Sequence, residues 1–258
     1  MTGASSGIGA ELARELVRRG LGVTLVARRA DRLHRLAAEL ASDGGARVEV
    51  LPADLSDAEE RAALPAAVAD LGLTVDVLVN NAGFSTSGPV HRADRARELE
   101  LVRTDVEAVV DLCTLFVAGM TSRRQGAVLN VASTAAFLPL PRQASYGAAK
   151  AFVLSYTHAL RAEVASTGVT VAALCPGPVD TEFAAVAGLD GDQLVGKLPR
   201  VLFVSPAAVA RAGIDGLAEG RAAVIPGVLN RAGAVASALA PPSLVARILH
   251  ATRHDGDR

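Results

Sequence analysis

The chain has 258 residues, of which 50% are hydrophobic and 3% aromatic, and its formal net charge is −1. This length fits one medium-sized domain, and the scattered, nearly balanced charges exclude a nucleic-acid-binding surface. No uninterrupted apolar run approaches the ~18 residues of a membrane-spanning helix, and no basic segment precedes an apolar one as in a signal peptide, so we expect a soluble cytoplasmic protein with no membrane partner.

A glycine-rich turn, TGASSGIG at residues 2–9, leads into the amphipathic segment AELARELVRRG, which predicts a helix. Glycine lets a backbone turn sharply and approach a ligand closely, and the N-terminus of a helix favours a pyrophosphate. The same pattern also fits a glycine-rich helix start that binds nothing. The candidate cofactor-binding residues of this turn are Gly3, Ser5, Ser6, Gly7, Ile8 and Gly9.

The apolar run GVTLVA at 22–27 predicts a strand, followed by Arg28, Arg29 and a helix over ADRLHRLAAELASDGG. An acidic residue at the end of such a strand would bind the ribose 2′-hydroxyl of NAD, but no carboxylate occurs here before Asp31. Guanidinium groups suit a 2′-phosphate, so NADP(H) is favoured over NAD, although one of the two arginines is expected to be only a solvated helix-start residue.

Two further strands are predicted at ARVEVLPADL, which ends at Asp54 and Leu55, and at VDVLVNNAG over 75–83. Ser56 has capping-box spacing with Glu59, which predicts that it starts the next helix. The asparagines at the end of the second run can tie neighbouring strands, or they can simply form a turn. A long helix is then expected from about residue 95 to residue 120.

The segment Asn130–Lys150 carries the candidate catalytic residues. Ser133 follows the buried strand GAVLNVA, at the carboxyl edge where open α/β sheets bind ligands, and Tyr146 and Lys150 lie four residues apart on one face of a predicted helix. A phenol with a pKa of about 10 needs roughly 4 kcal/mol of stabilisation of its anion to titrate near neutrality, and an ammonium supplies part of it. Ser133 would hold the substrate oxygen. The alternative is that the tyrosine and the lysine form an ordinary surface pair.

The last third predicts a strand followed by a proline-rich turn, VTVAALCPGPVDTEF at 169–183, then a substrate lid over 183–204, a helix over PAAVARAGIDGLAEG and a final strand AAVIPG. The prolines could also just end the strand. The Ala-rich C-terminal segment predicts an oligomer contact or a cover for the substrate. His250 and His254 have metal-compatible spacing but no third ligand, so no metal site is expected.

Five signatures over roughly residues 1–230 make the chain resemble the short-chain dehydrogenase/reductase family: the glycine turn, Asp54-Leu55, the NNAG run, Ser133 with YxxxK, and the PGPVxT turn. The resemblance implies one domain with a doubly wound parallel sheet, and a homodimer or homotetramer. It also implies that the adenine and nicotinamide contacts come from three segments. These residues are Asp54, Leu55, Asn81, Ala82, Gly83, Pro176, Gly177, Val179 and Thr181, with Tyr146 and Lys150 on the ribose.

Asp105 departs from the family pattern, because it stands where an asparagine of a water-linked proton relay is expected. A carboxylate only accepts hydrogen bonds unless it is protonated. Two alternatives stay open: Asp105 belongs to the catalytic set beside Lys150, or it is a surface residue that only aligns through a shifted helix register.

The glycine turn of the family normally follows a first strand in the centre of the sheet, whereas this sequence starts at Met1. We therefore expect the sheet to lack that strand, and hypothesise that the start lies too far downstream. The favoured function is an NADP(H)-dependent oxidoreductase that acts on a carbonyl or alcohol of a small, hydrophobic molecule. The alternative is a catalytically weak NADP-binding sensor or partner module.

Overall fold

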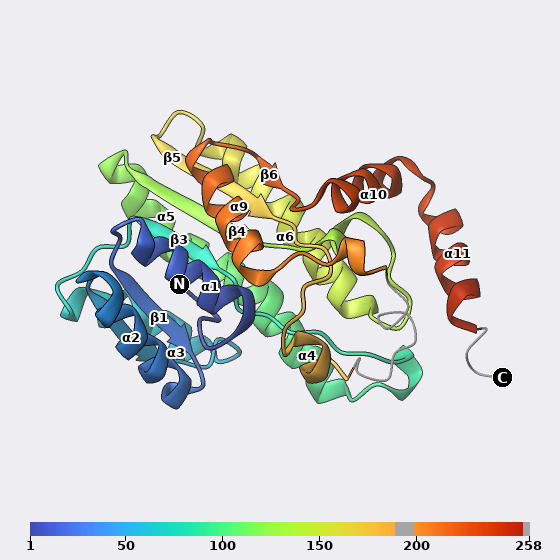
Figure 1. Cartoon of the computed structure of the whole chain (residues 1–258), viewed down its shortest axis with the longest axis horizontal. Helices are drawn as coiled ribbons and strands as arrows, with labels where there is room; N and C mark the ends of the chain where they lie inside the picture. Colours follow the sequence, from blue (N-terminus) through green and yellow to red (C-terminus); the bar gives the residue numbers. More distant parts are fainter. Residues whose placement is uncertain (189–198, 255–258) are drawn as a thin grey trace.

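The computed structural model describes residues 1–188 and 199–254, which fold into an α/β domain with helices on both faces of parallel strands (Figure 1). The strands are short apolar runs, as expected where both faces of a sheet are covered. On β4, the consecutive residues Val128 and Leu129 are both fully buried and point into the hydrophobic cores of opposite faces. The strands are β1 (Val23–Ala27), β2 (Val48–Pro52), β3 (Val77–Asn80), β4 (Gly126–Val131), β5 (Val169–Leu174) and β6 (Ala223–Val224).

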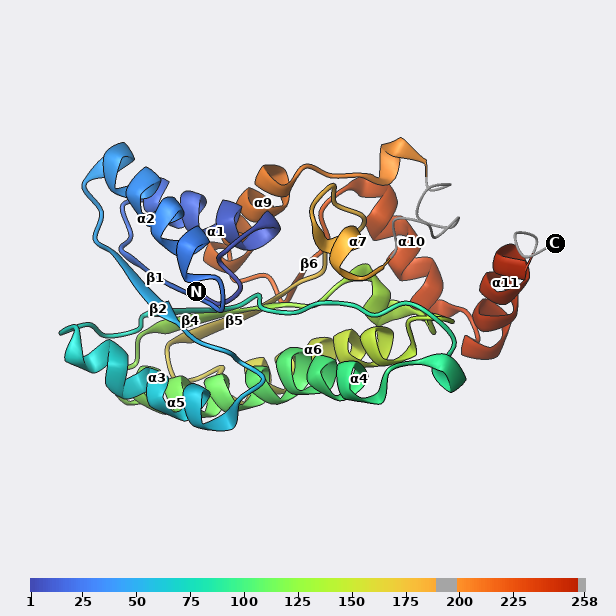
Figure 2. The same ribbon diagram turned by 90° about the horizontal axis from the view of Figure 1, so that it is seen from below.

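The helices form two layers, which Figure 2 shows above and below the strands. One layer holds α1 (Gly7–Arg18), α2 (Ala30–Gly44) and α9 (Pro206–Ala218). The other holds α3 (Ala58–Asp70), α4 (Arg95–Val102), α5 (Ala108–Arg123) and α6 (Ala144–Glu163). Both layers bury their apolar sides against the strands, so the doubly wound architecture expected from the sequence is confirmed.

The strands form two groups, β1-β2 and β3-β4-β5-β6, which meet at the first residues of the chain. Thr2 forms a single parallel bridge with Val26 of β1, and its N–H donates to the carbonyl of Val79 in β3 at 3.0 Å. The Val26 N–H donates in turn to the Met1 carbonyl at 2.9 Å. Within the described residues no strand lies between β1 and β3, so two residues join the groups where the family has a full strand.

Several predicted boundaries are wrong. The cap of α3 is Asp57, which accepts from the N–H groups of Glu59 and Glu60, and not Ser56. The side chain of Asp54 is responsible, because it accepts from both the N–H and the hydroxyl of Ser56 in a separate turn. The strand β2 ends at Pro52, and β6 spans two residues. The single helix expected over 95–120 is divided by a π-helical turn, Arg103–Glu107.

The C-terminal helices α10 (Val228–Leu239) and α11 (Pro242–His254) extend from the body beyond β6 (Figure 1). Only part of the predicted lid lies in the described residues: the short helix α7 (Phe183–Val186) and the 3₁₀ turn Arg200–Leu202. The side chains of His250 and His254 lie outside the described part. In the described residues no group of three His, Cys, Asp or Glu side chains could hold a metal ion.

One stretch of the described residues, Arg200–Ala218, is by length and composition alone apolar enough to cross a membrane. Its helical part α9 packs against α1, β4 and β5, and Val209 and Ala210 are buried in the core. A helix packed in a protein core passes the same test, so this stretch does not by itself indicate a membrane partner.

Candidate active site

A cleft of about 900 Å³ runs along the carboxyl edge of the strands and brings together every predicted cofactor-binding residue. Its walls come from segments far apart in sequence: the glycine turn, the ends of β1 to β5, the start of α6, and α7. This is the edge at which open parallel sheets bind ligands. Ser133, Tyr146 and Lys150 line the cleft as predicted, whereas Asp105 lies behind its wall and is fully buried.

The glycine turn and the NNAG run are fixed to each other by hydrogen bonds. The hydroxyl of Thr2 accepts from the N–H groups of Asn81 and Ala82 at 3.0 and 3.1 Å, and the Asn81 amide donates to the carbonyls of Thr2 and Gly3 at 3.2 Å each. Gly3 has φ +64°, and a Cβ on it would lie 2.7 to 2.8 Å from atoms of Asn81 and Ala82. Glycine is therefore required where these two segments form the floor of the cleft.

A buried polar chain fixes the helix that carries the catalytic candidates. Asn80 at the end of β3 donates to the side-chain oxygen of Asn130 in β4 at 2.9 Å, and Asn130 donates to the hydroxyl of Thr157 in α6 at 3.0 Å. Asn80 therefore ties strands, as one of its two predicted roles required. Because all three side chains are buried, these bonds hold α6 at one position on the sheet.

Arg28 and Arg29 both line the cleft but have different partners. Arg28 donates to a carboxylate oxygen of Glu100 at 2.9 Å. Arg29 donates to the hydroxyls of Ser5 and Ser6 in the glycine turn at 2.9 and 2.8 Å. Both guanidinium groups thus line the cleft and bind other side chains, Arg28 on α4 and Arg29 on the glycine turn, so neither is only a solvated helix-start residue.

The start of α6 brings Tyr146 and Lys150 to the inner end of the cleft, opposite Ser133. The Lys150 ammonium lies 5.7 Å from the centroid of the Tyr146 ring and donates to the Val131 carbonyl at 3.2 Å. The Ser133 hydroxyl donates weakly to the Pro176 carbonyl, at 3.4 Å, and accepts from the N–H of Ala135 at 3.1 Å. All three polar groups therefore meet at one place, and the alternative of an ordinary surface pair is wrong.

Asp105 makes an ion pair with Lys150, at 3.0 Å between its Oδ2 and the ammonium nitrogen. Its other oxygen accepts from the N–H of Phe84 at 3.0 Å. The π-helical turn carries Asp105 inward, so its exposed fraction is 0%. The alternative that Asp105 is a surface residue is therefore wrong, and this carboxylate holds the lysine from behind.

The sequence motifs only partly predicted how burial and charge shift the pKa values of Tyr146 and Lys150. Burial raises the pKa of Tyr146 above its ordinary value, against the opposing effects of Lys150 and of a hydrogen bond with Ser133, and the Asp105 carboxylate raises it further. Burial alone would lower the pKa of Lys150, but Asp105 raises it, which keeps the lysine charged. Lys150 thus acts on Tyr146 in the expected direction, but burial outweighs it in the protein alone.

Glu182 and Phe183 are site residues that sequence reasoning missed. The ring of Phe183 packs on the ring of Tyr146, with centroids 5.5 Å apart and planes inclined by 54°. Glu182, the preceding residue, forms ion pairs with Arg29 at 3.3 Å and Arg32 at 2.6 Å. The sequence held one usable signal, because both residues directly follow the PGPVxT turn. Nothing in the sequence indicated that Glu182 would pair with Arg32, 150 residues earlier.

Known proteins resemble this chain in sequence and in structure. A family model described as short chain dehydrogenase matches residues 1–190. A putative ketoacyl reductase of Streptomyces coelicolor is 35% identical over 247 residues, covering 90% of this chain and 94% of the relative. A very-long-chain 3-oxoacyl-CoA reductase of Anas platyrhynchos is 33% identical over 72% of this chain, which spans only 61% of that relative. The solved short-chain dehydrogenase from Sphingobium yanoikuyae in complex with NADPH has a TM-score of 0.82 and 32% identity, covering 92% of this chain and 91% of that one.

Proposed function

The chain belongs to the short-chain dehydrogenase/reductase family, and from that premise we propose that it is an NADP(H)-dependent oxidoreductase that interconverts a carbonyl group and a secondary alcohol on a hydrophobic small molecule. The observation that carries this proposal is the meeting of Ser133, Tyr146 and Lys150 at the inner end of one cleft. A protein that only sensed a cofactor would have no use for a proton donor, an oxygen-binding hydroxyl and a buried ammonium at one point.

The residues of the cleft fit NADP(H) on the protein's own geometry. Gly7, with φ +56°, is the first residue of α1 and lines the cleft. Because it has no side chain, a pyrophosphate can approach the backbone at this helix N-terminus. Arg28 and Arg29 both line the cleft, and Arg29 donates to the hydroxyl of Ser5 beside it; such guanidinium donors suit a 2′-phosphate. The cofactor complex of the Sphingobium relative adds support from outside the chain.

The protein's own groups account for the proton chemistry. When bound, NADP(H) supplies or accepts the hydride. Tyr146 gives a proton to the substrate oxygen during reduction and takes it back during oxidation, and Ser133 turns its weakly held hydroxyl from Pro176 to that oxygen. Lys150 stabilises the tyrosinate by its charge. Asp105 keeps Lys150 protonated and positioned without touching substrate.

The substrate side of the cleft is largely apolar, which supports a hydrophobic carbonyl compound. Its apolar lining comes from the segments around Ser133, α7, the turn at 200–203 and α10, namely Phe84, Leu138, Leu140, Phe183, Val186, Leu202, Phe203 and Leu229. Gln143 adds one polar side chain to this lining, and its amide donates to the hydroxyl of Ser85 at 2.9 Å. Ketoacyl chains would suit this lining, since one relative is named a putative ketoacyl reductase and another a very-long-chain 3-oxoacyl-CoA reductase. We also propose a cytoplasmic homo-oligomer.

The test is NADPH oxidation with a panel of ketones, aldehydes, 3-oxoacyl thioesters and oxosteroids, after NADPH binding has been measured directly. We expect the parent protein to reduce at least one hydrophobic ketone, and Tyr146→Phe to reduce the same ketone at least about 10²-fold more slowly. Tight NADPH binding with no turnover across the panel would support the alternative, a cofactor sensor.

A further inference from the structure

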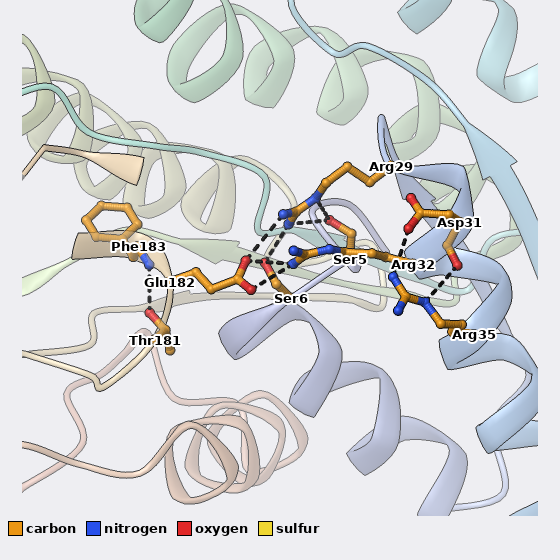
Figure 3. Close-up of polar contacts among 9 residues, drawn as sticks. All are labelled: Ser5, Ser6, Arg29, Asp31, Arg32, Arg35, Thr181, Glu182 and Phe183. Atoms are coloured by element: carbon orange, nitrogen blue, oxygen red, sulfur yellow. Dashed lines mark hydrogen bonds and ion pairs between the residues drawn. The ribbon is translucent and has the colours of Figure 1, made fainter. Parts of the chain in front are cut away.

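Glu182 occupies the anion-binding end of the cleft in the protein itself. Figure 3 shows dashed lines from its carboxylate to the guanidinium groups of both Arg29 and Arg32. Its two oxygens lie 2.9 and 2.6 Å from Nη1 of Arg32, and one of them lies 3.3 Å from Nη1 of Arg29. Arg29 simultaneously donates to the hydroxyls of Ser5 and Ser6. The Glu182 carboxylate thus pairs with Arg29, a guanidinium group that binds the cofactor phosphate according to the proposed function.

The contacts of Glu182 are of a kind that a stronger anion can replace. The side chain of Glu182 is 51% exposed, and those of Arg29 and Arg32 are 40% and 34% exposed. Ion pairs with this exposure are weak, because water stabilises the separated charges almost as well. A phosphate carries up to two charges and three acceptor oxygens, so it binds guanidinium groups more strongly than one carboxylate does.

The residue after Glu182 connects this end of the cleft to the catalytic tyrosine. Phe183 packs its ring on Tyr146, which is 8% exposed, and its N–H donates to the Thr181 hydroxyl at 3.3 Å. Because Glu182 and Phe183 are neighbours in the chain, the ion pairs of Glu182 help to hold the backbone next to this ring, and their loss loosens it.

We propose that Glu182 is an internal anion that the 2′-phosphate of NADP(H) displaces from Arg29 and Arg32, which frees the segment that covers Tyr146. This inference rests on the proposed function. NADH lacks the phosphate, so it leaves Glu182 in place and Phe183 on Tyr146. The Glu182 carboxylate therefore weakens NADPH binding, and α7 is released only when the cofactor that binds carries the 2′-phosphate.

Glu182→Gln tests the competition, since it removes the charge and keeps the shape. We expect its dissociation constant for NADPH, measured by cofactor fluorescence, to fall about three- to tenfold, which corresponds to the loss of two exposed ion pairs, and that for NADH to stay within about twofold. Glu219→Gln is the matched control: it makes the same change on a side chain that is 54% exposed and pairs with Arg221, at the end of α9 and outside the lining of the cleft. It should leave both constants unchanged.

Hydrogen–deuterium exchange of the amides at 183–187 provides a readout independent of affinity. Without cofactor, this segment should exchange faster in Glu182→Gln than in the parent, because the ion pairs that hold it to α2 are weakened, and Glu219→Gln should match the parent. Any of three results for Glu182→Gln would overturn the inference. These are an NADPH affinity equal to that of the parent, a gain in NADH affinity as large as the gain for NADPH, and an exchange rate at 183–187 equal to that of the parent. If the parent protein still binds NADPH and reduces a ketone, the proposed function stands even when this inference fails. If the parent protein does not bind NADPH, the proposed function fails as well.

Discussion

Replacing Asp105 by Asn removes one buried charge beside Lys150 with almost no change of shape, and it tests how the site sets the acidity of Tyr146. The Lys150 ammonium lies 3.0 Å from the carboxylate and 5.7 Å from the tyrosine ring centroid. Asp105 raises the pKa of Tyr146 through its charge, after the larger effect of burial. Without that charge the tyrosinate is easier to form, provided that Lys150 stays protonated.

The size of the effect follows from these distances. Together they put the carboxylate within about 9 Å of the tyrosine ring. At an effective dielectric constant of about 20, two unit charges that far apart interact by about 2 kcal/mol, which corresponds to roughly one pH unit. In the reductive direction Tyr146 must be protonated, so activity is lost as pH rises through its pKa. The basic limb of the kcat/KM profile should therefore move about one unit to lower pH in Asp105→Asn, with activity below that limb kept or increased.

The assay is kcat/KM for ketone reduction by NADPH across the alkaline range, for the parent, Asp105→Asn and Glu107→Gln. Glu107 lies in the same π-helical turn, but its side chain is 55% exposed and faces Arg61 at 3.6 Å, so its neutralisation should leave the profile unchanged. An overlay of Asp105→Asn on the parent would refute the coupling. A shift to higher pH would also refute it, because it would mean that Lys150 loses its proton without Asp105.

Three further substitutions test the other site residues. Tyr146→Phe should lower kcat by about 10² to 10⁴-fold while the dissociation constant for NADPH stays nearly unchanged, and substantial residual activity would assign the acid role elsewhere. Ser133→Ala should lower kcat by about 10² to 10³-fold, since it removes one donor to the substrate oxygen, and an effect confined to KM would contradict that role. Arg28→Asp should lower the ratio of kcat/KM with NADPH to that with NADH, whereas an unchanged ratio would show that Arg28 does not discriminate.

The parts of the site that the sequence predicted are those whose geometry is local. The glycine turn, the YxxxK spacing on α6 and the polar strand ends each fix a backbone shape or a helix face over a few residues, so their place in the cleft could be inferred. The position of Asp105 could not be inferred in the same way. It depends on a π-helical turn inside a segment whose pattern predicts one continuous helix, and that turn decides whether residue 105 faces Lys150 or solvent.

Contacts between distant segments were not predictable. Glu182 meets Arg29 and Arg32 because the chain before α7 lies beside the start of α2, and a glutamate followed by a phenylalanine carries no signal for either contact. The net rise in the pKa of Tyr146 is also a property of the fold, because it comes mainly from burial. That no strand lies between β1 and β3 in the described part of the chain could be expected from the family resemblance, but the way in which Thr2 joins the two strand groups required the structure.

Burial separates the roles of the two carboxylates that hold cations in this cleft. Asp105 is fully buried and pairs with Lys150, of which only 5% is exposed, so neither group can separate into water, and the pair positions the lysine although burial raises the pKa of the Asp105 carboxyl. Glu182 is half-exposed, and water stabilises it when a phosphate takes its place. Salt screens exposed pairs far more than buried ones. Raising the salt concentration from about 0.01 M to 1 M should therefore bring the NADPH affinities of Glu182→Gln and the parent together, and leave the pH difference between Asp105→Asn and the parent intact. If salt removed both differences, burial would not be what separates a positioning carboxylate from an exchangeable one.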